Sequence, residues 1–163
     1  MSDKRTGGRA AADKRGMTFD IHQVLSVLPQ RYPLVMIDRV LEVVPGKHLR
    51  ALKCVSYGEP WVQGHFPMRP MLPLGHLVEA LSQACTVLAY ATEPFDPVRS
   101  LLYFLGVEKL KLRHAVSPGD ALEIAAELVQ HRSNIWHFAA EATVERTVVA
   151  EAELVASLVD HEP

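Results

Sequence analysis

The sequence predicts an α+β fold in which one long buried helix packs against a twisted antiparallel β-sheet. Residues 73–92 have apolar side chains at helical spacing and are apolar nearly all round, as in a buried helix. A strand–turn–strand pattern precedes this segment, and four strand-like runs follow it. A long helix and an antiparallel sheet bury their apolar faces by stacking as two layers.

The first half of the chain predicts a short helix and a β-hairpin. Asp20 is a suitable N-cap for a helix that runs to Leu28, with apolar residues along one face. Residues 34–44 are rich in apolar and β-branched side chains and read as a strand. Pro45-Gly46 then forms a turn, and residues 47–57 return as the second strand.

The second half predicts the central helix and most of the sheet. A loop rich in glycine and proline spans residues 58–72, and the helix over 73–92 ends before the two prolines of segment 93–98. Ser117-Pro118-Gly119-Asp120 is a strong turn signal between two of the strands that follow. The four strands are expected at 100–116, 121–131, 135–145 and 148–159.

Length and composition indicate one globular domain behind a basic leader. Residues 1–17 are rich in glycine, alanine, lysine and arginine and have no apolar pattern, so they predict a disordered leader. Residues 18–163 are enough for a single domain with its own core. Because the leader is basic and the whole chain carries a net charge of −2, the domain is acidic, which argues against nucleic acid as a partner.

The cysteines and the hydropathy of the chain indicate its cellular compartment. Cys54 and Cys85 lie in apolar runs and are expected to be reduced core residues rather than disulfide partners or metal ligands. No apolar stretch is long enough to span a membrane, and the leader lacks the apolar region of a secretion signal. We therefore expect a cytoplasmic protein.

His65 and Glu79 are the residues most indicative of chemistry. His65 lies in Gly64-His65-Phe66-Pro67, where glycine and proline restrict the backbone around the imidazole. Glu79 lies inside the apolar helix with no cation three or four residues away, and an unpaired buried carboxylate is costly. On its own, Glu79 is equally compatible with a side chain that reaches solvent or caps a loop. The nearby histidine favours an acid–base pair.

Six short motifs, in order along the chain, resemble one enzyme family. They are Leu28-Pro29-Gln30-Arg31-Tyr32-Pro33, Ile37-Asp38-Arg39-Val40, Gly64-His65-Phe66-Pro67, Glu79-Ala80-Leu81-Ser82-Gln83-Ala84, Pro118-Gly119-Asp120 and Val149-Ala150-Glu151-Ala152-Glu153-Leu154. Over about residues 19–160 the chain resembles the FabZ-type (3R)-hydroxyacyl-[acyl-carrier-protein] dehydratases. That resemblance implies the hot-dog fold, in which a twisted antiparallel sheet wraps a long central helix.

The resemblance also implies an activity and an assembly. The expected reaction is dehydration of (3R)-hydroxyacyl-[acyl-carrier-protein] to the trans-2-enoyl thioester in fatty-acid biosynthesis, without a metal or redox cofactor. His65 and Glu79 match the family's catalytic pair, which two subunits of a homodimer contribute, and dimers assemble into a trimer of dimers. Tyr103 matches a tyrosine of the acyl tunnel, where Phe66 and Phe104 are also expected.

The chemistry suits these residue types. An imidazole takes up the weakly acidic α-proton near neutral pH, and a carboxyl group protonates the departing hydroxide directly or through water. Backbone N–H groups at the start of the central helix, those of Leu74 and Gly75, are candidates to stabilise the enolate oxygen.

One departure from the family pattern falls on this oxyanion site. Family members usually read Pro-Gly-Val where this chain has Pro73-Leu74-Gly75, so a leucine replaces the glycine whose N–H is thought to bind the thioester carbonyl. Leu74 keeps the N–H but adds a branched side chain. His76, where the family has an apolar residue, either influences Glu79 three residues later or is a tolerated histidine of the first helical turn.

A basic stripe is a candidate docking surface for an acidic carrier protein. Lys109, Lys111 and Arg113 alternate along an expected strand and so share one face, and Arg69 lies beside the His65 loop. An ordinary solvated strand face is the commoner explanation of such a pattern.

Several alternatives stay open at this stage. An acyl thioesterase shares the expected fold, and a weakened paralogue that binds acyl chains or a partner subunit would fit Leu74. A third alternative keeps the reaction but places it in a specialised polyene or polyketide pathway. A metal site formed by His65, His76 and Glu79 is less favoured, because the resemblance explains His65 and Glu79 without a metal.

Overall fold

The computed structural model describes residues 16–160, which form an antiparallel seven-stranded sheet, two α-helices and one 3₁₀-helix. The strand order across the sheet is β1-β2-β3-β5-β6-β7-β4, so β1 and β4 are the edge strands. The elements are β1 (Met17–Phe19), α1 (Ile21–Val27), β2 (Arg39–Val44), β3 (His48–Cys54), η1 (Pro60–Gln63), α2 (Leu74–Thr92), β4 (Ser100–Leu112), β5 (Ala121–Arg132), β6 (Ile135–Val144) and β7 (Thr147–Asp160).

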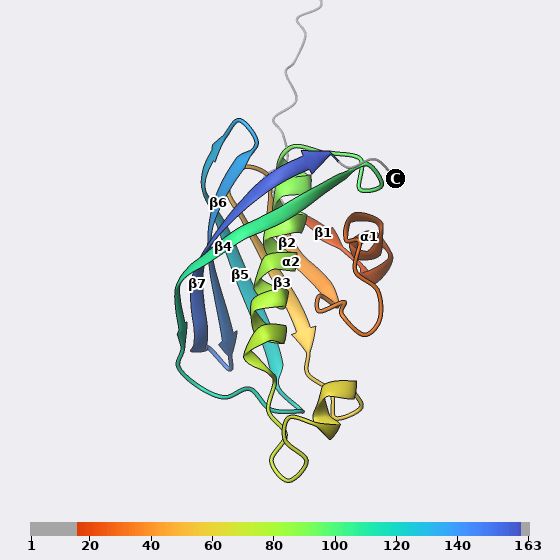
Figure 1. Ribbon diagram of the computed structural model, residues 1–163, viewed down its shortest axis with the longest axis vertical. Helices are drawn as coiled ribbons and strands as arrows, with labels where there is room; N and C mark the ends of the chain where they lie inside the picture. Colours follow the sequence, from red (N-terminus) through yellow and green to blue (C-terminus); the bar gives the residue numbers. More distant parts are fainter. Residues whose placement is uncertain (1–15, 161–163) are drawn as a thin grey trace, which may run out of the picture.

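The predicted two-layer arrangement is confirmed. Figure 1 shows the long helix α2 lying along one face of the curved sheet, with α1 beside it near β1 and β2. The segment between η1 and α2, which contains His65, forms a loop beyond the N-terminal end of α2 (Figure 1). This end of the molecule therefore combines a loop with the unpaired N–H groups of a helix start.

Helix α1 begins where the sequence indicates. The Asp20 carboxylate accepts a hydrogen bond from the Gln23 N–H at 2.9 Å, and the Gln23 side chain accepts one from the Asp20 N–H at 2.9 Å. This reciprocal capping box satisfies two N–H groups that the first helical turn leaves free.

Strand β2 begins later than the sequence predicts. A strand was expected from residue 34, but β2 starts at Arg39. The backbone of the preceding segment bonds to helix α2 instead: Met36 N donates to Gln83 Oε1 at 2.8 Å, and Gln83 Nε2 donates to the Leu34 carbonyl at 2.7 Å. A side chain thus satisfies the polar groups that a neighbouring strand would otherwise satisfy.

Helix α2 is buried within a single chain. Every residue from Ala80 to Ala89 is buried, partly against the sheet and partly against α1 and the segment before β2. The sequence predicted that part of so apolar a helix, or a sheet edge, would meet a second copy, and the middle of the helix is already covered within one chain. Exposed apolar side chains lie instead on edge strand β4, namely Tyr103, Leu105, Val107, Leu110 and Leu112.

The two cysteines differ in burial. Cys85, on α2, is buried as predicted, and burial raises the pKa of its thiol. The prediction for Cys54 was wrong: it ends β3 and is exposed. Its N–H donates to an Asp38 carboxylate oxygen at 2.6 Å, so the strand end is attached through its backbone rather than through a buried side chain.

Met17, expected as the last residue of the leader, belongs to the sheet. Most of the expected leader, residues 1–17, lies outside the described residues, but Met17 pairs with Val43 in the sheet as the start of β1.

No helix within residues 16–160 is long and apolar enough to cross a membrane.

Candidate active site

Backbone hydrogen bonds attach the His65 loop to η1. The Trp61 carbonyl accepts hydrogen bonds from Gly64 N at 3.0 Å and from His65 N at 2.9 Å. Further along, Leu72 N donates to the Val116 carbonyl at 2.7 Å, which fixes the loop against the strand connection before β5. The loop is therefore held at both ends, as the flanking glycine and prolines suggested.

A second pair of contacts orients the His65 ring. His65 Nδ1 lies 2.9 Å from the Met71 carbonyl oxygen, and Met71 N donates to the His65 carbonyl at 3.1 Å. The ring also stacks on Phe66, with centroids 4.1 Å apart. Because a carbonyl oxygen only accepts, Nδ1 is the nitrogen that carries the proton in the neutral tautomer of the ring, which leaves Nε2 with the lone pair in that tautomer. Nε2 has no hydrogen-bond partner among the described residues, so it is the ring atom available as a base.

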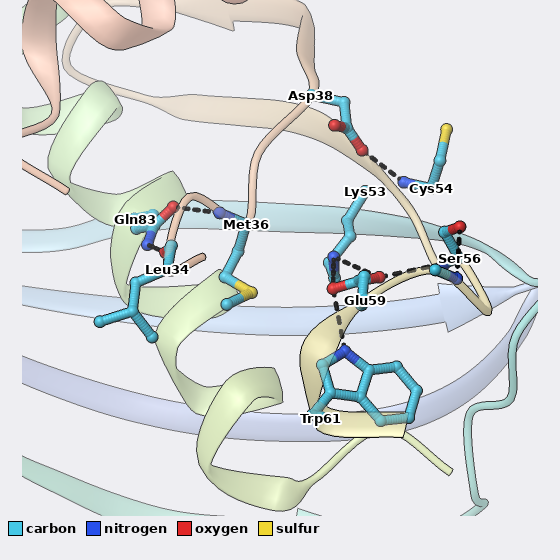
Figure 2. A network of polar contacts seen from close by, with 10 residues as sticks. Leu34, Met36, Asp38, Lys53, Cys54, Ser56, Glu59, Trp61 and Gln83 are labelled. Carbon is cyan, nitrogen blue, oxygen red and sulfur yellow. Dashed lines mark hydrogen bonds and ion pairs between the residues drawn. The ribbon is translucent and has the colours of Figure 1, made fainter. Parts of the chain in front are cut away.

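A largely buried ion pair, formed by Lys53 and Glu59, lies at the start of η1. Lys53 of β3 places Nζ 3.1 and 3.0 Å from the two carboxylate oxygens of Glu59, and their side chains are only 4% and 19% exposed. Figure 2 shows that Glu59 also accepts hydrogen bonds from Ser56 N and from the Trp61 indole. Burial alone would raise the pKa of Glu59, but these hydrogen bonds and the charge of Lys53 outweigh it and lower that pKa.

Two amide side chains position Glu79. Glu79 Oε1 accepts hydrogen bonds from Gln30 Nε2 at 2.9 Å and from Gln83 Nε2 at 2.8 Å. The other oxygen, Oε2, has no hydrogen-bond partner among the described residues and is the atom available to a substrate. Glu79 is half-buried rather than fully exposed, and it pairs with no described cation.

Glu79 lines a small cavity of about 60 Å³ between α2 and the start of β4. Phe104, expected in the substrate tunnel, lines this cavity too, whereas Tyr103 is not among the lining residues and is 62% exposed. Phe66 lines a different hollow, with Arg69 and Met71. Within one described chain, no hydrogen bond or ion pair connects His65 to Glu79.

The start of α2 presents free N–H groups. Leu77 N is the first helical N–H with a partner, the Pro73 carbonyl at 3.1 Å, so those of Leu74, Gly75 and His76 have no acceptor in the described part of the chain. The Leu74 side chain is 40% exposed. A Cβ placed on Gly75 would have no atom within 4 Å, so Gly75 leaves open space beside these donors.

The expected basic stripe is charge-compensated. Lys109 pairs with Glu153 at 2.7 Å, and both Lys111 and Arg113 pair with Glu151, at 3.0 and 2.9 Å. The two glutamates alternate along β7 with buried Ala152 and Leu154, so the stripe occupies the sheet face away from α2. Arg69 is exposed beside the His65 loop and pairs with no described carboxylate.

The described residues were also compared with the metal site that the sequence left open. Within residues 16–160, no group of three or more His, Cys, Asp or Glu side chains is arranged to hold a metal ion. His65, His76 and Glu79, which the sequence left as a possible ligand set, do not form such a group.

Sequence comparison assigns the family. A family model for the FabA-like domain matches residues 28–153. The chain is 54% identical over 147 residues to the 3-hydroxyacyl-[acyl-carrier-protein] dehydratase FabZ of Sorangium cellulosum, covering 90% of this chain and 95% of that protein. The chain belongs to the FabZ dehydratase family. A FabZ from Myxococcus xanthus is 44% identical over 141 residues, 86% of this chain and 92% of its own length.

Solved structures identify the fold. The dehydratase heterocomplex ApeI:P from Xenorhabdus doucetiae superposes with a TM-score of 0.68 at 21% identity, covering 83% of this chain and 90% of that one. The smu.793 protein of Streptococcus mutans, bound to acetyl CoA, gives 0.62 at 14% identity, over 83% and 98%. This FabZ-family chain therefore has the hot-dog fold that its motifs suggested.

The residues that hold the candidate catalytic pair were not found from sequence. Gln83 lies four residues after Glu79, so the helical spacing contained a signal for that contact. Gln30 is 49 residues from Glu79, and no local pattern predicts a contact between them. The ion pair between Lys53 and Glu59 was also not predictable from the sequence, because a charged residue in a strand or loop is normally exposed.

Proposed function

We propose that this FabZ-family chain is a hydro-lyase that converts (3R)-hydroxyacyl-[acyl-carrier-protein] thioesters to trans-2-enoyl thioesters in fatty-acid biosynthesis, with His65 and Glu79 as catalytic residues. The observation that carries the reaction is the 54% identity over nearly the whole chain to a curated FabZ dehydratase. The contacts of His65 and Glu79 support their roles, because each side chain keeps one free atom of the type that the reaction needs.

The reaction breaks a C–H and a C–O bond and forms a C=C bond. His65 Nε2 takes the α-proton, while Nδ1 stays bonded to the Met71 carbonyl and keeps the ring oriented. The electron pair of the C–H bond forms the double bond, and the β-hydroxyl leaves. The Glu79 carboxyl supplies its proton, from Oε2 directly or through a water, so that the leaving group is water. Proton exchange with solvent then returns both groups to their starting states.

The thioester oxygen needs hydrogen-bond donors while negative charge develops on it. The free N–H groups of Leu74 and Gly75 at the start of α2 are suited to this role, since the helix dipole adds to their effect. Gly75 has open space around it and allows a close approach, whereas Leu74 carries a side chain at the same place.

A second copy of the chain is part of the proposed site. Among the described residues, edge strand β4 pairs only with β7, and it presents exposed apolar side chains such as Leu105 and Val107. An unpaired apolar edge readily pairs with another strand. We propose a homodimer through β4 that brings His65 of one copy to Glu79 of the other, and, from the family resemblance, a trimer of such dimers.

The carrier protein is proposed to dock beside the His65 loop. Arg69 is exposed there and lies with Phe66 on the rim of the same hollow. Lys109, Lys111 and Arg113 would have to exchange Glu151 and Glu153 for carboxylates of the carrier, so Arg69 is the better-supported contact. An enzyme that acts on carrier-bound intermediates is expected in the cytoplasm.

The direct test is an assay with a (3R)-hydroxyacyl thioester. Enoyl formation is followed together with the release of free thiol, because a dehydratase forms the enoyl thioester and an acyl thioesterase releases thiol. Enoyl formation without thiol release supports the proposal. Thiol release without enoyl formation would replace it with a thioesterase function.

A further inference from the structure

The buried Lys53–Glu59 ion pair has no part in the proposed proton transfers. Lys53 projects from β3, and Glu59 is the residue that precedes η1 (Figure 2). Removing two charges from water is expensive, and apolar residues of similar shape often give equal or greater stability. Stability alone is therefore a weak reason for a buried charged pair at this position.

Glu59 makes four hydrogen bonds that converge on one carboxylate. Lys53 Nζ lies 3.1 and 3.0 Å from its two oxygens, Ser56 N donates to Oε1 at 3.0 Å, and Trp61 Nε1 donates to Oε2 at 2.9 Å. Charged hydrogen bonds are stronger and more directional than neutral ones. The pair thus fixes η1 to strand β3, a rigid element of the sheet.

Trp61 connects this ion pair to the His65 loop. Its indole N–H bonds to Glu59, and its carbonyl oxygen accepts the N–H groups of both Gly64 and His65. Hydrogen bonds therefore connect Lys53 to Glu59 and Glu59 to the Trp61 side chain, and the Trp61 backbone carbonyl in turn binds the His65 N–H. The Met71 carbonyl then orients the imidazole.

Apolar packing offers little alternative support for the loop. Phe66 is 51% exposed and Met68 is 97% exposed, so the residues that follow His65 bury few side chains in the core. Val62 and Leu72, on either side of the His65 loop, are buried, so packing holds the ends of the segment. Hydrogen bonds are then the main contacts that place the residues between them, including His65.

We propose that Lys53 and Glu59 are positioning residues for His65, and that their ion pair sets the place of the imidazole relative to the substrate. This inference rests on the catalytic role proposed for His65. A displacement of about 1 Å in a catalytic group can lower the rate about a hundredfold. Neither Lys53 nor Glu59 lies where the acyl chain or carrier is expected to bind, so KM should change little.

The test compares this buried pair with an exposed one on the same strand. Arg50 of β3 pairs with Glu123 at 2.9 Å, and both side chains are 52% exposed. Lys53→Met and Glu59→Gln are assayed for kcat and KM on a (3R)-hydroxyacyl thioester well below the melting temperature, with Arg50→Met as the control. Glu59→Gln keeps the shape of the side chain, so it serves if Lys53→Met does not fold.

Hydrogen–deuterium exchange of segment 60–72 gives a readout that is independent of activity. In Lys53→Met and Glu59→Gln we expect faster exchange in this segment and a kcat lower by about tenfold to a hundredfold, with KM within about twofold of wild type. Arg50→Met should match wild type in all three quantities. His65→Ala is assayed in parallel to test the proposed role of His65 itself.

Two results would overturn the inference in distinguishable ways. If His65→Ala is inactive but folded Lys53→Met and Glu59→Gln variants keep the wild-type kcat, the ion pair only stabilises the fold and the proposed function stands. If His65→Ala keeps near-normal activity, the proposed mechanism fails, and the positioning role fails with it.

Discussion

Gln83 lies one helical turn after Glu79 on α2 and donates a hydrogen bond to Glu79 Oε1 at 2.8 Å. The same amide nitrogen donates to the Leu34 carbonyl, and its oxygen accepts from Met36 N. One buried side chain therefore both orients the candidate catalytic carboxylate and satisfies the segment before β2.

Gln83→Leu should consequently be strongly destabilising. It leaves the buried Met36 N–H without a partner, which costs about 1–3 kcal/mol, and it also removes the hydrogen bond to the carbonyl of the more exposed Leu34. We expect the free energy of unfolding to fall by about 2–4 kcal/mol in urea titrations. Gln130→Leu, an exposed glutamine on β5, is the control and should change stability little. Equal stability of the two variants would contradict the role assigned to Gln83.

The pKa of Glu59 predicts a dependence of stability on pH. Its pKa in the folded protein lies below the reference value of 4.5, so the unfolded chain binds a proton at a higher pH than the folded one does. The ionised Glu59 carboxylate therefore adds to the free energy of unfolding in full above about pH 4.5. This stabilisation is lost as the pH falls through the lower pKa of the folded protein. Unfolding free energies measured across this range should decline less steeply in Glu59→Gln than in wild type. If the unfolding free energies of the two proteins decline equally with falling pH, Glu59 does not contribute to the loss of stability in acid.

The proposed sharing of the site between two copies predicts complementation. His65→Ala and Glu79→Gln subunits are each expected to form inactive homodimers. After mixing and verified subunit exchange, heterodimers should contain one site with both native residues and recover part of the wild-type activity. No recovery despite confirmed exchange would place both residues of a site in one chain, or remove one of them from the mechanism.

Leu74, which stands where the family has glycine, predicts that kcat/KM of this chain is lower than the rest of its site would allow. Leu74→Gly together with Gly75→Val restores the family order, and one oxyanion donor is worth about 10²–10³ in rate. If Leu74 holds the N–H groups off their best geometry, this variant should raise kcat/KM on a short 3-hydroxyacyl thioester about tenfold. The open space around Gly75 supports a rival account, in which Gly75 already provides the close approach. A fall in kcat/KM would favour that account and reject the idea of a weakened dehydratase.

Element types were predictable because local periodicity determines them. The apolar spacing of α2 and the turn at Ser117–Asp120 predicted the central helix and the order of the strands. The start of β2 was not predictable in the same way, because Gln83, 47 residues away from Met36, takes the place of a neighbouring strand. Apolar content alone does not show whether backbone groups pair within a sheet or with a side chain.

The candidate site likewise contains residues that short motifs identify and contacts that they do not. His65 and Glu79 could be identified from short motifs, whereas their supporting contacts cross long sequence separations, as in the bond from Gln30 to Glu79. The sequence left open whether part of α2 or a sheet edge would carry an exposed apolar surface, because the burial of a helix depends on segments that are distant in the sequence. Edge strand β4 carries such a surface.

The most direct test of the proposed activity and mechanism is a single comparison of wild type, His65→Ala and Glu79→Gln on a (3R)-hydroxyacyl-carrier-protein thioester. Conversion to the trans-2-enoyl thioester is followed by mass, and circular dichroism checks that each variant is folded. We predict turnover by wild type, no detectable turnover by His65→Ala, and a loss of about 10²-fold or more for Glu79→Gln. Near-normal turnover in either folded variant, or none in wild type, would contradict the proposal.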